Sequence, residues 1–186
     1  MCIDLLRNTV ASLCLALSGL AHAGMGFTEL AGLPDDGPVT VYYPTASDGQ
    51  RVQKGPFALQ LDMQGAPMRG NGRLVLISHG SGGSPWTSTQ LARSLVDDGF
   101  LVALPRHRGD NYTDPSSPGP DSWKQRPAEV SRAIDAVARD PRFAPLLALD
   151  KVGMYGMSAG GHTALSLAGG RWSPARLARH CDANIA

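Results

Sequence analysis

The sequence has few of the features that mark nucleic-acid-binding or membrane-spanning proteins. Its 186 residues carry a formal net charge of +1, 6% aromatic residues and three cysteines. Without an excess or a run of basic residues, the chain lacks the electrostatic signature of a nucleic-acid-binding protein. No apolar run reaches the roughly 20 residues that a membrane-spanning helix needs. From these absences we expect neither a nucleic-acid partner nor a membrane anchor. Hydrophobic residues make up 42% of the chain, which allows a sizeable core in one domain.

The first 23 residues follow the three-part plan of a secretory signal peptide. Arg7 is the basic residue near the start, residues 10–20 are apolar, and residues 21–23 read Ala-His-Ala, a small-x-small cleavage site. We expect cleavage after Ala23, a secreted or periplasmic location, and one mature domain over residues 24–186. The alternative is that this segment is a buried N-terminal helix.

Beyond this segment, apolar runs alternate with helical patterns. Strands are expected over residues 39–43, 57–63, 74–77, 100–104 and 151–155, and helices over residues 85–98, 127–139, 159–168 and 175–180. The strand at residues 39–43 is expected near a sheet edge because Pro44 follows it. Pro127 is expected at the first helical position, and residues 105–121 form a long loop. The alternation predicts an α/β fold, a mostly parallel sheet with helices on both faces.

The motif with the clearest chemistry is G-x-S-x-G at residues 156–160. An apolar run precedes it and a helical pattern of small residues follows it, as in a nucleophile elbow. A strand that turns abruptly into a helix crowds its neighbours, so Gly156 and Gly160 keep the flanking positions minimal. Ser158 would then stand at a helix N-terminus as the nucleophile. The alternative is a glycine-rich turn in which Ser158 only caps the helix.

A second glycine-rich motif, H-G-S-G-G at residues 79–83, follows a predicted strand. Attack of a serine on an ester creates an oxyanion, which preorganised backbone N–H groups must stabilise. One N–H is expected from Ala159 and the other from Ser81, while His79 orders the loop and Gly80 allows a close approach to the substrate. The alternative is an ordinary strand-to-helix loop. A phosphate-binding turn is disfavoured because no K-[ST] follows the glycines.

Four segments occur in one order: residues 79–83, P-R-H-R-G-D-N at 105–111, R-P at 126–127 and G-M-S-A-G-G at 156–161. Over residues 38–181 the chain resembles the α/β-hydrolase superfamily. More narrowly it resembles the predicted dienelactone hydrolase branch, which is related to the platelet-activating-factor acetylhydrolases. The resemblance implies hydrolysis of small-molecule esters or lactones through an acyl-enzyme, with neither a metal nor an organic cofactor.

The residues after Ser158 depart from the order Ser, Asp or Glu, His of this superfamily. The 28 residues that follow contain His162, His180 and Asp182 as candidates. His162, one turn past Ser158 on the same expected helix, is expected to pack rather than to act as the base. His180 and Asp182 come in reverse order and two residues apart, which does not suit a relay. We therefore expect a C-terminally truncated hydrolase domain, in which Cys181 would lack a downstream disulfide partner.

Several residues keep two interpretations. His107 is expected either at the mouth of the site or as an exposed loop histidine. Trp86, Tyr112 and Trp123 could line an acyl pocket, although core or surface packing is the default for aromatic residues. Two functions stay open: a serine hydrolase that is weak or inactive as this chain, and a non-catalytic, truncated or degenerate hydrolase-fold protein.

Overall fold

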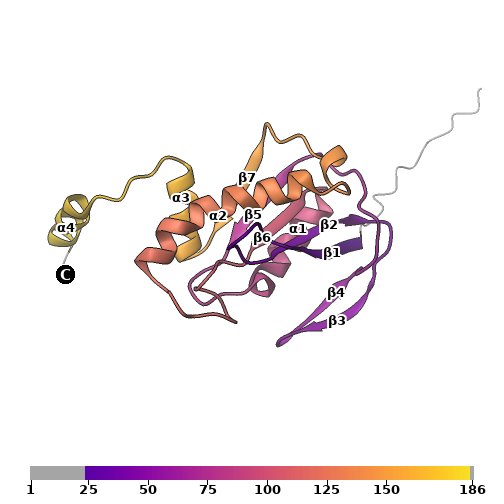
Figure 1. Cartoon of the computed structure of the whole chain (residues 1–186), viewed down its shortest axis with the longest axis horizontal. Coiled ribbons are helices and arrows are strands. Elements are labelled where there is room, and N and C mark those ends of the chain that lie inside the picture. The colour runs from indigo at the N-terminus through magenta and orange to yellow at the C-terminus, as the bar shows by residue number, and fades with distance from the viewer. Residues whose placement is uncertain (1–23, 185–186) are drawn as a thin grey trace, which may run out of the picture.

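The computed structural model describes residues 24–184, so the predicted signal segment at residues 1–23 lies outside the described residues. A five-stranded sheet in the order β1-β2-β6-β5-β7 forms the centre (Figure 1). Its strands are β1 (Gly24–Leu30), β2 (Val39–Thr45), β5 (Leu74–Ser78), β6 (Leu101–Pro105) and β7 (Val152–Gly156). Strands β6, β5 and β7 are parallel, whereas β2 runs antiparallel to both β1 and β6.

The helices cover both faces of this sheet. They are η1 (Pro85–Ser88), α1 (Thr89–Asp97), α2 (Pro120–Arg139), η2 (Ala144–Leu146), α3 (Ala159–Leu167) and α4 (Pro174–Ala183). Helices α2 and α3 pack against each other on one face, and α1 packs on the other (Figure 1). Helix α4 stands apart from the sheet and buries no residue. This arrangement confirms the predicted α/β class, with parallel core strands flanked by helices.

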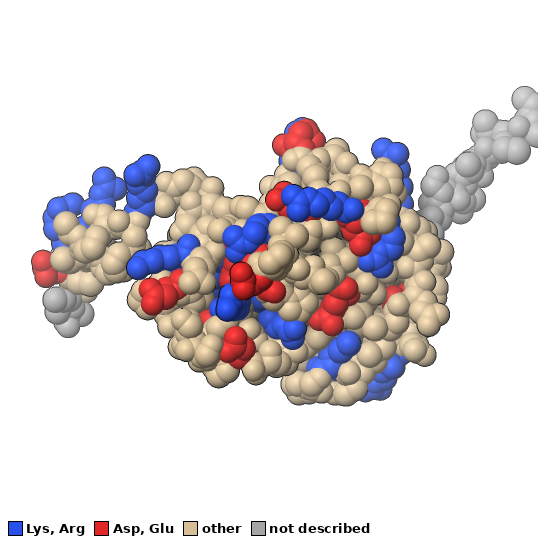
Figure 2. Space-filling model, viewed as in Figure 1, with Lys and Arg blue, Asp and Glu red and all other residues tan. Residues whose placement is uncertain are grey.

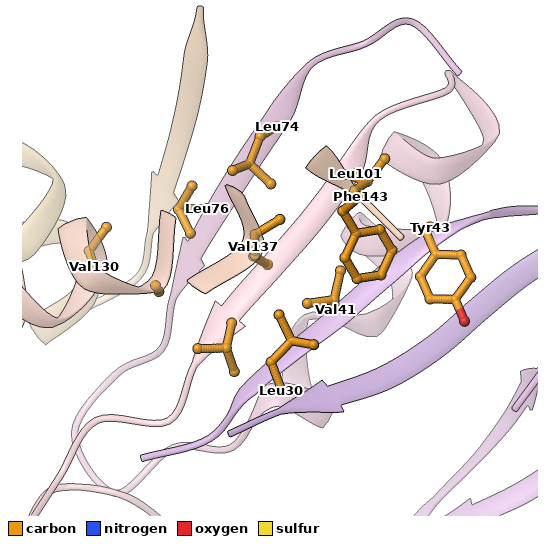
Figure 3. Packing of buried hydrophobic residues seen from close by; sticks show 12 residues of the cluster. Leu30, Val41, Tyr43, Leu74, Leu76, Leu101, Val130, Val137 and Phe143 are labelled. Carbon is orange, nitrogen blue, oxygen red and sulfur yellow. The ribbon is translucent and has the colours of Figure 1, made fainter. Parts of the chain in front are cut away.

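The period-2 pattern of the central strands creates two apolar clusters, one on each side of the sheet. In β6, Leu101 and Ala103 face the α2 side, whereas Val102 and Leu104 face the α1 side. Figure 3 shows the α2 side, where Val137 of α2 lies over side chains from β5 and β6. Because both faces of these strands are covered, their sequences are continuous apolar runs.

The two N-terminal strand assignments differ from the sequence expectations. Strand β1 was not predicted, and it rather than β2 is the outer strand on that side of the sheet. The prediction that Pro44 ends β2 was also wrong, because the strand continues to Thr45. Pairing of β2 with β6 covers only Val39 to Tyr42, so Pro44 lies where β2 has β1 alone as its neighbour. A proline is tolerated there because it interrupts no ladder shared between two partners.

Two further segments were assigned incorrectly. The hairpin of β3 (Gln50–Lys54) and β4 (Phe57–Leu61) was only half predicted, because β3 is polar and mostly exposed. Helix α2 begins at Pro120, seven residues before the predicted start, and Pro127 lies inside it. Gly119 precedes the helix with φ of 93°, and Pro120 takes the first helical turn that was assigned to Pro127.

The carboxyl ends of the parallel strands determine where a site can form. Strands β5, β6 and β7 end at one edge of the sheet, with Ser78 of β5 opposite Gly156 of β7. The loops that follow them therefore meet at this edge, as is usual for sites of open α/β sheets.

On the face seen in Figure 2, basic and acidic side chains are interspersed rather than separated by sign. Within residues 24–184, no helix combines the length and the apolar character required to cross a bilayer.

We predict that Phe143→Ala lowers the free energy of unfolding by about 3–5 kcal/mol. Phe143 is fully buried, and its ring centroid lies 5.2 Å from that of Tyr43, so truncation leaves a cavity. Leu165→Ala is the control, because Leu165 is 69% exposed and its loss should change stability by only about 0.5 kcal/mol. Urea unfolding of both variants measures the difference, and equal losses would contradict the assignment of Phe143 to the core.

Candidate active site

Ser158 occupies the tip of a sharp strand-to-helix turn. It lies between β7 and α3 with φ of 56° and ψ of −120°, and it is one of two non-glycine residues with positive φ among residues 24–184. A side chain is strained in this region of backbone space, and such strain is held only where surrounding packing enforces it. The strain exposes Ser158 at the N-terminus of α3, where the helix dipole favours negative charge.

The packing that enforces this turn is backbone against backbone. A Cβ at Gly156 would overlap the carbonyl oxygen of Gly160, and a Cβ at Gly160 would overlap that of Ser78 in β5. The Met157 N–H also donates to the Ser78 carbonyl oxygen at 3.3 Å. Glycine is therefore required at both positions because of close approach, as the motif predicted.

The glycine-rich loop at residues 79–83 lies directly beside the elbow. A Cβ added to Gly80 would stand 3.3 Å from the Ser158 Cβ. The structure thus brings together the two motifs, which are separated by more than 70 residues in the sequence.

Two N–H groups of this loop already have acceptors. The Gly82 N–H donates to Asp110 Oδ1 at 2.9 Å, and the Gly83 N–H donates to the Gly80 carbonyl at 3.1 Å. In the described part of the chain, the N–H groups of Ser81 and Ala159 have no acceptor. These two are the groups assigned to an oxyanion hole from the motifs, and they are free to receive a ligand oxygen.

Sequence reasoning missed the buried ion pair beneath this loop. Arg126 of α2 is fully buried and donates to Asp110 Oδ2 at 2.8 Å and to the His79 carbonyl at 2.6 Å. In the sequence, Asp110 and Arg126 are parts of the segments that carry the resemblance, and no chemical role follows from them there. One signal was available: Arg126 lies four residues before Val130 on the stripe that α2 turns to the core.

A buried series of hydrogen bonds connects α2 with the end of β5. Glu129 accepts a hydrogen bond from His107 Nδ1, and Ser78 Oγ lies 2.7 Å from His107 Nε2. With Nδ1 protonated toward the carboxylate, the Ser78 hydroxyl donates to Nε2. His107 is fully buried, so neither expectation for it, at the site mouth or exposed, was right.

His79 is held in one tautomer below the loop. Its Nδ1–H donates to the Gly80 carbonyl at 2.7 Å, and its Nε2 accepts the His107 backbone N–H at 3.2 Å. Burial, with the neighbouring His107, lowers the pKa of His79 to about 4. Burial, with the Arg126 charge, lowers the pKa of His107 to about 3. Both imidazoles are therefore neutral at pH 7 and act as hydrogen-bonding parts of the loop.

None of the described histidines forms a hydrogen bond with Ser158 Oγ, which has no partner within residues 24–184. His162 donates its backbone N–H to the Ser158 carbonyl, and its ring lies 5.8 Å from that of Trp123. His180 and Asp182 belong to the exposed helix α4.

The aromatic candidates have different environments. Trp86 packs in the α1-side core, 5.8 Å from Phe27, and Tyr112 is 49% exposed. Trp123 lines a groove of about 420 Å³ between α2 and α3, together with Pro120, Lys124, Pro127, His162, Ser166 and Trp172. Within residues 24–184, no group of three or more His, Cys, Asp or Glu side chains could hold a metal ion.

We predict that two adjacent glycines respond oppositely to alanine. Gly160→Ala should lower the free energy of unfolding by about 3 kcal/mol or more, because its Cβ would overlap the Ser78 carbonyl. Gly161→Ala should change stability by about 1 kcal/mol or less, in the stabilising direction, because Gly161 is helical and its Cβ would come no nearer than 3.5 Å to the Gly156 carbonyl oxygen. Thermal and urea unfolding of both proteins test this, and similar losses would contradict the packing of α3 on β5.

We predict that stability declines as the pH falls from 6.5 to 4. A histidine has a pKa near 6.5 when unfolded, so in this window the unfolded chain binds more protons than the folded one. His79 alone accounts for about 3 kcal/mol of this loss, and above pH 6.5 its contribution is fully present. Urea unfolding at a series of pH values measures the slope. His79→Asn, which keeps a donor near the Nδ1 position, should reduce that slope, and an unchanged slope would contradict the assignment.

Comparison with known proteins adds structural relatives. No protein-family model and no curated protein matches the chain. Among solved structures, a ferulic acid esterase from Streptomyces cinnamoneus is 18% identical with a TM-score of 0.59, and the match covers 80% of this chain and 55% of the esterase. A candidate dienelactone hydrolase from Klebsiella pneumoniae is also 18% identical, with a TM-score of 0.45 and coverage of 79% and 55%.

The chain thus spans about half the length of both solved structures. Its sheet order, its elbow at Ser158 and the match to the esterase agree with one another. The chain therefore has the α/β-hydrolase fold and is a distant structural relative of an esterase.

Proposed function

We propose that the protein is a serine hydrolase that acts on carboxylic esters or lactones through an acyl-enzyme on Ser158. The observation that carries this proposal is the pairing of the strained, exposed Ser158 with unoccupied N–H groups at Ala159 and Ser81. A serine that merely capped α3 would accept a hydrogen bond from the first turn, but the Ser158 side chain accepts none.

Each part of this arrangement has a chemical role in the proposed reaction. Ser158 Oγ attacks the carbonyl carbon, and the carbonyl oxygen becomes an oxyanion. The N–H groups of Ala159 and Ser81 donate to this oxyanion, and the N-terminal end of α3 adds a favourable dipole. The ester C–O bond then breaks, and the leaving oxygen takes up the proton that came from Ser158, either as a free alcohol or, from a lactone, as a hydroxyl that stays on the acyl group. Water attacks the acyl-enzyme, which releases the carboxylic acid and restores the Ser158 hydroxyl.

The proposed reaction also needs a base that takes the Ser158 proton. His79 and His107 are committed to buried hydrogen bonds, and His162 is directed to Trp123. We therefore propose that the base is supplied by polypeptide outside residues 24–184. In support, ten large hydrophobic side chains are exposed among residues 24–184, and seven of them lie between residues 149 and 177, in or beside β7, α3 and α4.

The groove between α2 and α3 is proposed as the pocket for the apolar part of the substrate. It begins at His162, one helical turn from Ser158, and it contains the indoles of Trp123 and Trp172. Pockets of about 300–1,000 Å³ with mostly apolar walls are typical of small-molecule sites. The similarity to a ferulic acid esterase favours an aromatic acid ester as the first substrate to try.

A non-catalytic hydrolase-fold protein is the second candidate. It is favoured by one observation, the absence of any hydrogen-bond partner for Ser158 Oγ within residues 24–184.

Export after cleavage at Ala23 stays a prediction under either function.

We predict that a fluorophosphonate probe labels Ser158 in the folded full chain, tested as the full-length gene product together with the polypeptide proposed to supply the base, and that Ser158→Ala abolishes labelling. Ser94→Ala is the control, because Ser94 is an exposed serine on α1, on the other face of the sheet, and its loss should leave labelling unchanged. Peptide mapping by mass spectrometry identifies the modified residue. A folded chain that takes up no probe would contradict the proposed hydrolase, and ester turnover that Ser158→Ala removes would exclude the non-catalytic alternative.

A further inference from the structure

We propose that Arg126 and Asp110 are positioning residues of the oxyanion hole, which fix the loop at residues 79–83 so that the Ser81 N–H is presented to the reacting carbonyl. The catalytic meaning of this inference rests on the proposed serine hydrolase. The conformational claim rests on the contacts alone and can be tested without activity.

The Arg126 guanidinium binds the loop from below. Its Nη1 donates to the His79 carbonyl at 2.6 Å, and its Nη2 approaches the Gly80 carbonyl at 3.5 Å. Its Nε donates to Ser122 Oγ at 3.1 Å, one turn earlier in α2. The fork geometry of arginine allows these simultaneous contacts, which a lysine ammonium on a flexible stem cannot reproduce.

Asp110 connects this guanidinium to the other end of the same loop. Its Oδ2 accepts from Arg126 at 2.8 Å, while its Oδ1 accepts from Ser81 Oγ at 2.6 Å and from the Gly82 N–H at 2.9 Å. Burial raises the pKa of Asp110, but the hydrogen bonds from Ser81 and Gly82, with the Arg126 charge, bring it below its usual value. The carboxylate is therefore ionised when it holds the loop.

These contacts occupy the two N–H groups that follow Ser81 in the loop and leave the Ser81 N–H free. Asp110 occupies the Gly82 N–H, the Gly80 carbonyl occupies the Gly83 N–H, and the Ser81 N–H keeps no acceptor. The Gly80 carbonyl belongs to the same peptide unit as the Ser81 N–H, and it accepts from His79 Nδ1 and the Gly83 N–H as well as facing Arg126. Acceptance at one end of a peptide strengthens donation at the other, because hydrogen-bonded groups polarise one another.

Stability alone does not account for this ion pair. Burial of two charges carries a desolvation penalty that their attraction seldom exceeds. In this case, the other hydrogen bonds of the two side chains are with the 79–83 loop, with Ser122 and with the Asp110 backbone carbonyl, so the pair specifies one loop conformation.

Helix α2 offers a matched control pair. Arg132 donates to both carboxylate oxygens of Asp36 at 2.6 Å, two turns after Arg126, and neither residue contacts the loop at residues 79–83. Asp36→Asn therefore removes one carboxylate charge from an ion pair with an arginine of the same helix. It should leave the loop at residues 79–83 unchanged.

The test compares Asp110→Asn with Asp36→Asn in the full chain, with two readouts. The first is the rate of fluorophosphonate labelling at Ser158, and the second is the amide chemical shift of Gly82 and Ser81 in selectively ¹⁵N-labelled protein. We expect Asp110→Asn to slow labelling about 100-fold, the scale of a misplaced catalytic group, and to move the Gly82 amide upfield. Asp36→Asn should change neither readout.

Asp110→Asn can fail to fold, because it leaves the buried Arg126 charge without its partner. Ser81→Ala then serves as the second variant, since it removes only the hydroxyl that donates to Asp110 and keeps the backbone N–H. It should slow labelling about tenfold, the equivalent of one lost hydrogen bond, while the variant still folds.

The outcomes separate this inference from the proposed function. Labelling of Asp110→Asn or Ser81→Ala at the wild-type rate would overturn the positioning role, and so would faster labelling, which would mean that the Asp110 charge opposes the oxyanion. If the wild-type chain is not labelled at all, the proposed function fails and the amide shifts decide. A Gly82 amide shift that changes in Asp110→Asn but not in Asp36→Asn supports the claim that Asp110 fixes the conformation of the loop at residues 79–83. An unchanged shift overturns that claim.

Discussion

The elbow depends on one close contact, the packing of the first turn of α3 against the carboxyl end of β5. Gly160 lies so near the Ser78 carbonyl that no side chain fits between them, and Gly156 lies equally near Gly160. With these backbones in contact, only Met157 and Ser158 are left between strand and helix, and Ser158 adopts a positive φ. The strain at the nucleophile is thus a consequence of how tightly α3 sits on the sheet.

The same end of β5 is also held by helix α2. Arg126 and Glu129 lie three residues apart on its buried face, and each begins a separate polar chain. Arg126 donates hydrogen bonds to carbonyl oxygens of the loop after β5. Glu129 is linked to Ser78 by hydrogen bonds through His107. One helix therefore fixes both the strand end on which α3 rests and the loop beside Ser158. A buried polar network of this kind specifies a single arrangement, because every alternative leaves a buried group without a partner.

Much of the fold follows from local patterns in the sequence. The apolar runs that became β5, β6 and β7 are recognisable because both of their faces are covered. Strand β1 was not recognisable, since two of its seven residues are glycine and its sequence shows no clear alternation. The start of α2 was missed because two prolines compete for its first turn, and only the position of Gly119 decides between them.

For the candidate site, the sequence by itself determined the turn at Ser158 and the glycines that the turn requires, because these are properties of neighbouring residues. It also indicated that the loop at residues 79–83 would meet this turn. Only the tertiary structure decided the roles of Arg126, Asp110, His107 and Glu129. The partners in these hydrogen bonds lie between 16 and 47 residues away in the chain. Because a buried charge or imidazole must be hydrogen-bonded, its role depends on partners that only the folded structure identifies.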